Sequence, residues 1–307
     1  MVFYDPAFAV SSIDLELTTR CPFHCSICPR SHLPNGEWEF PFPLFARLTP
    51  FFLRHFARIT LSGMGTPVCH PCWERFITHY RKRGGVIGLT IHAATLVPAI
   101  TATIHKVKPS FLEISLPSAS PQGFQALCPG LEYGETLDRL RAFLAEKPPC
   151  PTALVAVQTD ANPQEKDRIL ELASRFNVTA RVYPLHHRAG YLAAGQPPES
   201  GLPTVRCGLF AMQTFIAADG CVYPCVHDVE RRHPLVDLKK DPPQKLLEIK
   251  HRFSVDPDAS PFTRLCRKCD DQRRNLSIPD RPFPPTRRAW GGFMKDYLQR
   301  NARRLQL

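Results

Sequence analysis

The sequence lacks the features of a secreted or membrane-spanning protein. Its first residues, Met1 to Pro6, contain neither a basic start nor the long apolar stretch of a signal peptide. No run of residues approaches the ~18 apolar positions that a membrane-spanning helix needs. The chain also contains no internal repeat, so a repeat architecture is not expected. We therefore expect a cytoplasmic protein with no membrane partner.

Cysteine, in contrast, is abundant, with 12 Cys among 307 residues. In a reducing cytosol, clustered cysteines indicate metal or redox chemistry rather than disulfides. The length and the 43% apolar content suffice for one large domain with a sizeable core plus a small one. The net charge of +11 indicates either a generally basic surface or a preference for an anionic substrate or partner.

Short β-rich runs alternate with helical stretches over about the first 190 residues. The clearest helical pattern is Pro163–Phe176, whose apolar face includes Ile169, Leu170 and Phe176. Six such units in sequence predict an α/β fold with a parallel sheet and right-handed crossovers, curved into a full or partial (β/α)6 barrel. In such barrels the active site lies on the loops that follow the strands. The expected strands are Ile13–Leu17, Ile59–Leu61, Val86–Ile91, Phe111–Leu116, Ala153–Gln158 and Ala180–Leu185.

The character of the sequence changes after about Tyr191. Residues 195 to 203 form a proline-containing linker, and Thr214–Tyr223 predicts a hairpin with an Asp-Gly turn. A helical stretch follows at Pro243–Phe253. We therefore expect a barrel over residues 1–190, a small domain over 195–275 and a basic, proline-rich tail over 276–307.

Three cysteines with the spacing C-x3-C-x2-C directly follow the first expected strand. They are Cys21, Cys25 and Cys28. Three thiolates can each bind one iron of a four-iron cluster and leave the fourth iron open for chemistry. The spacing alone also allows a zinc site completed by His24 or His32.

The residues around these cysteines resemble the signature of the radical SAM superfamily. The resemblance covers Leu17 to Arg30 and a second motif with a Gly-rich turn, Ile59 to Pro71. It implies a [4Fe–4S] cluster on the three cysteines, whose open iron binds S-adenosylmethionine. It further implies that an electron, from a donor such as a flavodoxin or ferredoxin, releases a 5′-deoxyadenosyl radical, which removes a hydrogen atom from the substrate.

The resemblance also implies residues that contact S-adenosylmethionine. The backbone of the Gly-rich turn would face the methionine amino group, Ile27 would lie beside the adenine, and Ser115 would contact the ribose. The sequence departs from the family where Thr66 replaces a usual Glu, Ile27 a usual aromatic residue, and His92-Ala93-Ala94 a usual Thr-Asn-Gly. The implied cofactor-binding residues are Ile27, Gly63, Met64, Gly65, Thr66 and Ser115.

A second group of cysteines lies near the C-terminal end of the sequence. Cys207, Cys225, Cys266 and Cys269 resemble the C-terminal extension called SPASM, in its short Twitch form, which holds one auxiliary [4Fe–4S] cluster. Four thiolates leave no open iron, which favours electron transfer over substrate binding. The residues alone also allow a structural zinc site with the same four ligands. Cys221 is either an alternative ligand or a free thiol on the hairpin.

Other residues are weaker candidates for catalysis. Cys128, after the fourth strand, is a candidate hydrogen-atom donor of the kind an epimerase needs, or a packed apolar residue. Arg181, Tyr183 and His186 lie in or after the sixth strand, where a cation can pair with a substrate anion. The alternative is that these three are solvated or packed residues.

Our first functional hypothesis is a radical SAM enzyme that oxidises a small-molecule or peptide substrate through the auxiliary cluster. The alternatives within the superfamily are a peptide or protein maturase and an epimerase. An alternative of a different class is a zinc-stabilised module that binds nucleic acid through its basic surface. The sequence lacks the interleaved aromatic and basic residues typical of such modules, which counts against it.

Overall fold

The computed structural model of the chain describes residues 10–159, 164–192, 207–256 and 258–271. The expected linker at 195–203 and tail at 276–307 lie outside the described residues. The chain packs into two compact units, neither of which is continuous in sequence. We call them the central unit, residues 17–28 and 60–185, and the terminal unit, residues 1–16, 29–59 and 186–307. This division by packing cuts across the domain boundary expected near residue 190, which stays a prediction.

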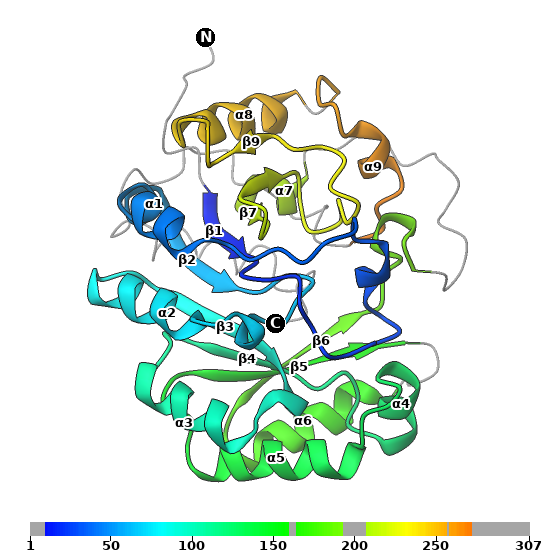
Figure 1. Cartoon of the computed structure of the whole chain (residues 1–307). Helices are drawn as coiled ribbons and strands as arrows, with labels where there is room; N and C mark the ends of the chain where they lie inside the picture. The colour runs from blue at the N-terminus through cyan, green and yellow to red at the C-terminus, as the bar shows by residue number, and fades with distance from the viewer. Residues whose placement is uncertain (1–9, 160–163, 193–206, 257, 272–307) are drawn as a thin grey trace. The chain divides into compact units, whose positions relative to one another are not determined.

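The central unit contains a parallel sheet with alternating helices. Strands β3 to β6 are hydrogen-bonded in the order β3-β4-β5-β6, and all three pairings are parallel. Helices α3, α5 and α6 cover one face of these strands (Figure 1). The strands are β3 (Ile87–His92), β4 (Leu112–Ser115), β5 (Thr152–Gln158) and β6 (Thr179–Pro184). The helices are η2 (Pro67–Cys69), α2 (Trp73–Lys82), η3 (Ala93–Thr95), α3 (Pro98–Val107), α4 (Pro121–Leu127), α5 (Tyr133–Ala145) and α6 (Glu165–Arg175).

The core of the central unit follows from the apolar pattern of these elements. Ile87, Leu89 and Ile91 of β3 are buried, as in a parallel sheet that helices cover. Helix α6 matches the expected helix and buries Ile169 and Leu172, each contributing roughly 1.5–3 kcal/mol to stability. Leu170, which we expected on the apolar face, is 45% exposed. It follows Ile169 directly, and one residue rotates the side chain by about 100° on a helix, which turns it to solvent.

The terminal unit joins the first strand to the hairpin. Strand β1 (Val10–Leu15) pairs in parallel with β7 (Gln213–Ile216), which pairs antiparallel with β8 (Cys221–Tyr223), and β8 pairs antiparallel with β9 (Val236–Asp237). Strand β2 (Phe56–Leu61) contributes residues to both units. The helices are η1 (Pro29–His32), α1 (Phe42–His55), η4 (Arg188–Gly190), α7 (Gly208–Met212), α8 (Gln244–Val255) and α9 (Thr263–Arg267). None of the helices in the described part of the chain has the length and apolar character needed to span a membrane.

The hairpin is present with the expected Asp-Gly turn. Gly220 adopts a φ of 83°, and the Cys221 amide donates to Asp219 Oδ1 at 2.8 Å. Buried Glu16 links β1 to this hairpin, because its Oε2 accepts hydrogen bonds from the Ala218 amide at 3.1 Å and from Arg231 Nη2 at 2.8 Å. The hairpin is therefore held on β1, which fixes the position of the loop after β8.

Candidate metal centres

The three clustered cysteines lie in a loop of the central unit that is anchored at several points. The Cys28 amide donates to the Cys25 carbonyl at 3.0 Å, so a tight turn brings these two residues together. The Ser26 amide donates to the Leu127 carbonyl at 2.9 Å. All three cysteines remain partly exposed. The backbone of the loop is thus fixed while its thiols stay accessible to a metal.

The Gly-rich turn packs directly against this cysteine loop. The Thr66 amide donates to the Arg20 carbonyl at 2.9 Å. A Cβ on Gly65 would lie 2.0 Å from the Thr18 carbonyl oxygen, so only glycine fits there. The Thr66 hydroxyl is buried and has no hydrogen-bond partner among the residues that the structure describes. An unsatisfied buried hydroxyl beside the cysteine loop fits a polar cofactor at this place.

Cys128 and His92 contact the cysteine loop. Cys128 is buried at the end of α4, and its Sγ lies 3.7 Å from Cys25 Sγ and 3.6 Å from His92 Nε2. The Ala94 amide donates to His92 Nδ1 at 3.1 Å, and burial lowers the pKa of His92 to about 4. The neutral ring therefore carries its proton on Nε2.

These bonds form a directed chain from His92 through Cys128 to Cys25. The pKa of Cys128 is raised, mainly by its hydrogen bond to Cys25 and also by burial. Cys128 therefore stays a neutral thiol that donates to Cys25. We expected Cys128 in the loop after the fourth strand, and the structure places it one helix later. Its role as a hydrogen-atom donor stays a prediction.

The candidate residues of β4 and β6 are placed along the sheet of the central unit. Arg181 forms an ion pair with Glu113 of β4, so its charge is already compensated within the protein. Ser115 at the end of β4 lies in register with His92 of β3. Tyr183 lies opposite Val157 of β5. The structure therefore does not present Arg181 as an unpaired cation for a substrate anion. Ile27, in the cysteine loop, is partly buried.

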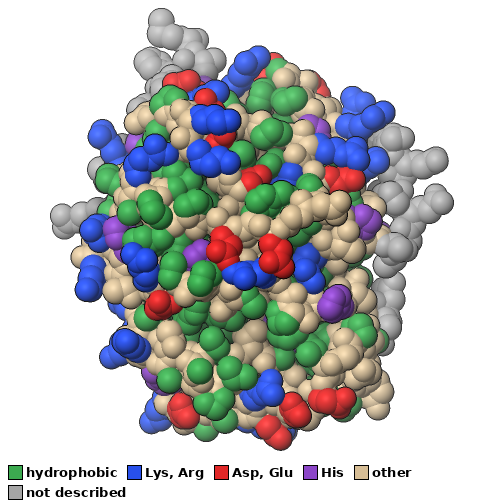
Figure 2. Space-filling view, in the orientation of Figure 1, with side chains coloured by type: hydrophobic (Ala, Val, Ile, Leu, Met, Phe, Trp, Pro, Cys, Tyr) green, Lys and Arg blue, Asp and Glu red, His purple; other side chains and the backbone are tan. Residues whose placement is uncertain are grey.

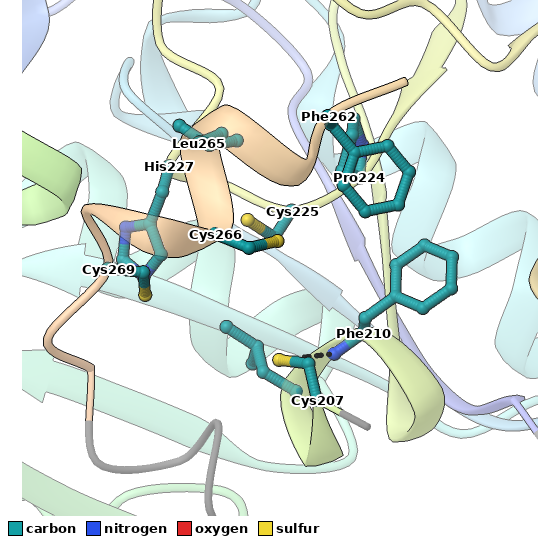
Figure 3. Close-up of a pocket in the computed structure, with 10 residues that line it drawn as sticks. Cys207, Phe210, Pro224, Cys225, His227, Phe262, Leu265, Cys266 and Cys269 are labelled. Atoms are coloured by element: carbon teal, nitrogen blue, oxygen red, sulfur yellow. Dashed lines mark hydrogen bonds between the residues drawn. The ribbon is translucent and has the colours of Figure 1, made fainter. Parts of the chain in front are cut away.

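The four later cysteines line one pocket in the terminal unit. Figure 3 shows Cys207 at the start of α7, Cys225 after the hairpin, Cys266 on α9 and Cys269 just beyond it, with their sulfur atoms around a common space. Cys207 Sγ accepts a hydrogen bond from the Phe210 amide at 3.4 Å. Apolar residues surround the thiols, among them Leu209, Phe210, Pro224, Phe262 and Leu265.

This pocket combines four thiols with a buried lysine. The pKa of Cys225 is raised well above its usual value. Burial is the main cause, and the neighbouring thiolates of Cys269, Cys266 and Cys207 add to it. Lys250 of α8 is 2% exposed, and its Nζ donates to the Phe210 carbonyl and to the Gln213 carbonyl, the latter at 2.6 Å.

Among the described residues, the charged groups that act on Lys250 are the thiolates of Cys207 and Cys225 and not a carboxylate. Burial lowers the pKa of Lys250 to about 7, and these thiolates oppose the shift. A buried cation and crowded thiolates are each costly alone, but they compensate one another when the thiolates bind a metal centre of net negative charge. The site therefore fits a four-thiolate centre.

Three further thiols, those of Cys69, Cys72 and Cys221, lie outside both clusters of cysteines. Cys221 does not line the four-cysteine pocket. Its pKa is raised to about 11, mainly by burial and to a smaller extent by the nearby carboxylates of Asp219 and Asp237. Burial also raises the pKa of Cys69 and Cys72, so neither thiol is activated by its position near a helix start. All three therefore remain protonated thiols at neutral pH.

Three residues of these sites were not expected from the sequence: His227, Lys250 and Asp271. His92 was noted in the sequence as a departure from the family, but its contact with Cys128 was not expected. His227 and Asp271 each follow a pocket cysteine by two residues, which is a signal that sequence reasoning can use. Lys250 is one of many lysines in the sequence, and only the fold reveals that it is buried. His186 lies beside His227 and Asp271 in the terminal unit.

Comparison with known proteins gives one sequence relative. No family model matches the chain. The tungsten-containing aldehyde ferredoxin oxidoreductase cofactor-modifying protein of Pyrococcus furiosus is 26% identical over 84 residues, which are 27% of this chain and 24% of that protein. The match thus spans about a quarter of the curated relative.

Solved structures cover the chain much more fully. SuiB of Streptococcus suis, bound to the precursor peptide SuiA, has a TM-score of 0.66 at 11% identity, over 86% of this chain and 70% of SuiB. The enzyme anSMEcpe with bound AdoMet has a TM-score of 0.60 at 13% identity, over 96% and 97% of the two chains. BtrN in complex with AdoMet and 2-DOIA has a TM-score of 0.54 at 13% identity, over 89% and 96%. These neighbours confirm the predicted resemblance: the chain has the fold of the radical SAM enzymes.

Proposed function

We propose that the chain is a radical SAM enzyme that oxidises its substrate. A [4Fe–4S] cluster binds to Cys21, Cys25 and Cys28, and an auxiliary [4Fe–4S] cluster binds to the four-cysteine pocket. When bound, the first cluster and S-adenosylmethionine supply the radical that removes a hydrogen atom from the substrate. One observation carries the proposal. A chain with this fold contains both an anchored three-cysteine loop and a four-cysteine pocket.

At the first site, the residues of the central unit bind and orient the cofactors. Three thiolates hold three irons and leave one iron position for S-adenosylmethionine. The turn from Gly63 to Thr66 packs against the cysteine loop, so its backbone groups and the buried Thr66 hydroxyl would lie next to the cofactor. An external donor such as a flavodoxin or ferredoxin would reduce this cluster.

At the second site, four thiolates would occupy every iron, which leaves no position for substrate. A fully ligated centre in an apolar pocket is suited to accept an electron. Removal of a hydrogen atom would take one electron and one proton from the substrate. A centre held by these four thiolates would supply an acceptor for the second electron, and the second proton would pass to water. Lys250 supports this role in its protonated form, because a positive charge favours the addition of an electron nearby.

The comparisons support two substrate classes. The chain covers 96% of BtrN, whose structure holds the small molecule 2-DOIA, and this favours a small-molecule substrate. Peptide modification is the second candidate, because the similar structures of SuiB and anSMEcpe were determined with bound peptides. On the face shown in Figure 2, basic side chains are scattered among acidic and apolar ones, so this face does not favour a zinc-stabilised nucleic-acid module.

Anaerobic purification tests the proposal directly. We expect brown protein with about eight iron atoms per chain, four for each cluster. Incubation with reductant, S-adenosylmethionine and panels of polyols and peptides should yield a product that has lost two hydrogen atoms. An epimerase would give a different result. Its product would have the mass of the substrate in ordinary water, and in heavy water it would carry one solvent deuterium at the inverted carbon. Colourless protein rich in zinc would contradict the proposal.

Replacement of Cys128 by Ala should shift the first cluster to a more negative reduction potential without loss of iron. The Cys128 thiol donates to Cys25, and hydrogen bonds to cluster sulfurs stabilise the reduced state. Cys128→Ser, which keeps a donor, should shift the potential less. An EPR-monitored redox titration measures both variants. Loss of iron from Cys128→Ala would show instead that Cys128 is a cluster ligand.

Replacement of Lys250 by Met should shift the auxiliary cluster to a more negative potential. Met has a similar length but no charge, so a nearby compensating cation is removed. The matched control is Lys245→Met, because Lys245 lies on the same helix with its side chain 44% exposed and paired with Asp241. Equal potentials for the two variants would rule out a specific electrostatic role for Lys250.

A further inference from the structure

The terminal unit holds a third group of metal-ligating side chains outside both sets of cysteines. His186 Nε2, His227 Nε2 and Asp271 Oδ2 come from three separate segments, and their ligand atoms lie within 4.8 Å of one another. The side chains of His227 and Asp271 are 1% and 4% exposed, and that of His186 is 17% exposed. We propose that these three residues bind one divalent metal ion.

The distances between the donor atoms fit ligands of a shared ion. His227 Nε2 lies 2.9 Å from Asp271 Oδ2, which is a hydrogen-bond distance, whereas His186 Nε2 lies 3.8 Å from the same oxygen. The second distance is too long for a hydrogen bond. Two donors that each bind a metal at about 2.0–2.2 Å commonly lie about 3–4 Å apart. The rings of His186 and His227 meet edge to face, with centroids 5.0 Å apart, so they do not stack against each other.

Asp270 supplies the support that metal-bound histidines usually have. Its Oδ1 lies 4.0 Å from His186 Nδ1, and this oxygen is buried without a hydrogen-bond partner among the described residues. Its Oδ2 accepts from the amide of His187 at 2.7 Å and contacts the Nδ1 of His187 at 2.6 Å. Histidine ligands typically donate their second ring N–H to a carboxylate, which fixes the ring. In this structure His186 Nδ1 instead accepts a hydrogen bond from the Arg188 amide at 3.3 Å. Metal binding through Nε2 would therefore move the ring proton to Nδ1 and turn that nitrogen from the Arg188 amide toward Asp270.

The donor set indicates which ions fit and what they would bind. Two imidazoles and one carboxylate suit Zn²⁺, Fe²⁺ or Mn²⁺ and leave coordination positions open. An open position on such an ion takes an oxygen ligand, such as a hydroxyl or carboxylate of a substrate. His227 also lines the four-cysteine pocket, so the ion would lie beside the proposed auxiliary centre. The site would thus hold an oxygen-bearing ligand next to an electron acceptor.

Another His–Asp pair in the same unit provides a contrast. His233 Nδ1 lies 3.2 Å from Oδ1 of buried Asp228, as in an ordinary hydrogen-bonded pair. Among the residues that the structure describes, no third ligand atom joins this pair to form a possible metal site. The substitution His233→Ala is therefore a matched control for His186→Ala, since both remove a partly exposed histidine from a buried aspartate.

The test uses Mn²⁺ and the anaerobic protein with its clusters assembled. Thiolates are poor ligands for Mn²⁺, and the EPR signal of aqueous Mn²⁺ disappears on binding, so free and bound ion are measured directly. We expect one Mn²⁺ per chain, with binding weakened at least ~100-fold in His186→Ala and Asp271→Asn. Asp270→Asn should weaken it about 10–100-fold, as outer-sphere partners do. His233→Ala should bind as the unmodified protein does.

Iron and sulfide contents, measured on the same samples, separate this proposal from that of the clusters. His186→Gln serves as a second variant that keeps a polar side chain. Lost Mn²⁺ binding with clusters and circular dichroism intact supports the site. No binding by the unmodified protein at millimolar Mn²⁺, or equal binding by the His186 variants, overturns it. The proposal is also overturned if Mn²⁺ binding is lost only in variants that lose their clusters. In that case the two histidines and Asp271 stabilise the fold and do not bind a metal ion.

Discussion

Replacement of Cys225 by Ala is expected to remove about four iron atoms per chain and to abolish net substrate oxidation. S-adenosylmethionine should still be cleaved, because Cys225 belongs to the terminal unit and the three-cysteine loop to the central unit. Loss of one of four thiolates leaves an iron without its protein ligand in a pocket that is otherwise apolar. The variant would form the radical but would lack the acceptor for the second electron.

The matched control for this prediction is Cys221→Ala. Cys221 lies on the hairpin that precedes Cys225, but it does not line the pocket, so its loss should leave iron content and product formation unchanged. Iron, sulfide, 5′-deoxyadenosine and oxidised product are measured for both variants. Full iron content in Cys225→Ala would contradict the proposed ligand set. Equal effects of the two substitutions would contradict the specificity of the pocket.

Replacement of Gly65 by Ala is expected to lower the rate of S-adenosylmethionine cleavage by about 100-fold or more. The new Cβ would lie 2.0 Å from the Thr18 carbonyl oxygen and 2.8 Å from that of Arg20, so the backbone must move. This movement separates the Gly-rich turn from the cysteine loop. A displacement of about 1 Å can cost roughly 100-fold in rate, because bound cofactor and reacting atoms lose alignment.

Gly134→Ala provides the control for the effect of a glycine substitution itself. Gly134 lies in α5, and a Cβ there would meet no atom within 4 Å. Alanine favours a helix over glycine by up to about 1 kcal/mol, so thermal stability should stay equal or rise slightly. Cleavage rates and melting temperatures are compared for the two variants. Cleavage by Gly65→Ala at the rate of the unmodified protein would show that the turn does not position the cofactor.

The fold was largely predictable because its signals are local. Every expected strand overlaps an observed one, since each strand is a short apolar run bounded by polar or turn residues. The first strand begins earlier than expected, at Val10 rather than Ile13. The packing of this strand was not predictable, because its parallel pairing with β7 joins segments about 200 residues apart. That pairing assigns β1 to the terminal unit rather than to the central one.

The same difference applies to the candidate sites. Residues close together in the sequence could be assigned to a site, whereas residues brought together only by the fold could not. Cys21, Cys25 and Cys28 lie within eight residues, so their spacing alone indicates a shared metal. The approach of His227 to Asp271 joins residues 44 positions apart and leaves no periodic pattern in the sequence. Arg181 had the right residue type for an anion site, but its partner Glu113 lies on β4, two strands away across β5. Distant pairings of this kind depend on strand order and register, which composition does not encode.

The proposed function depends on cleavage of S-adenosylmethionine at Cys21, Cys25 and Cys28. The most direct measurement is 5′-deoxyadenosine formed by the anaerobic, iron-loaded and reduced protein. We predict that the unmodified protein forms it and that Cys25→Ala, prepared in the same way, forms none. The absence of 5′-deoxyadenosine from unmodified protein carrying about eight iron atoms, or its equal formation by Cys25→Ala, would contradict the account.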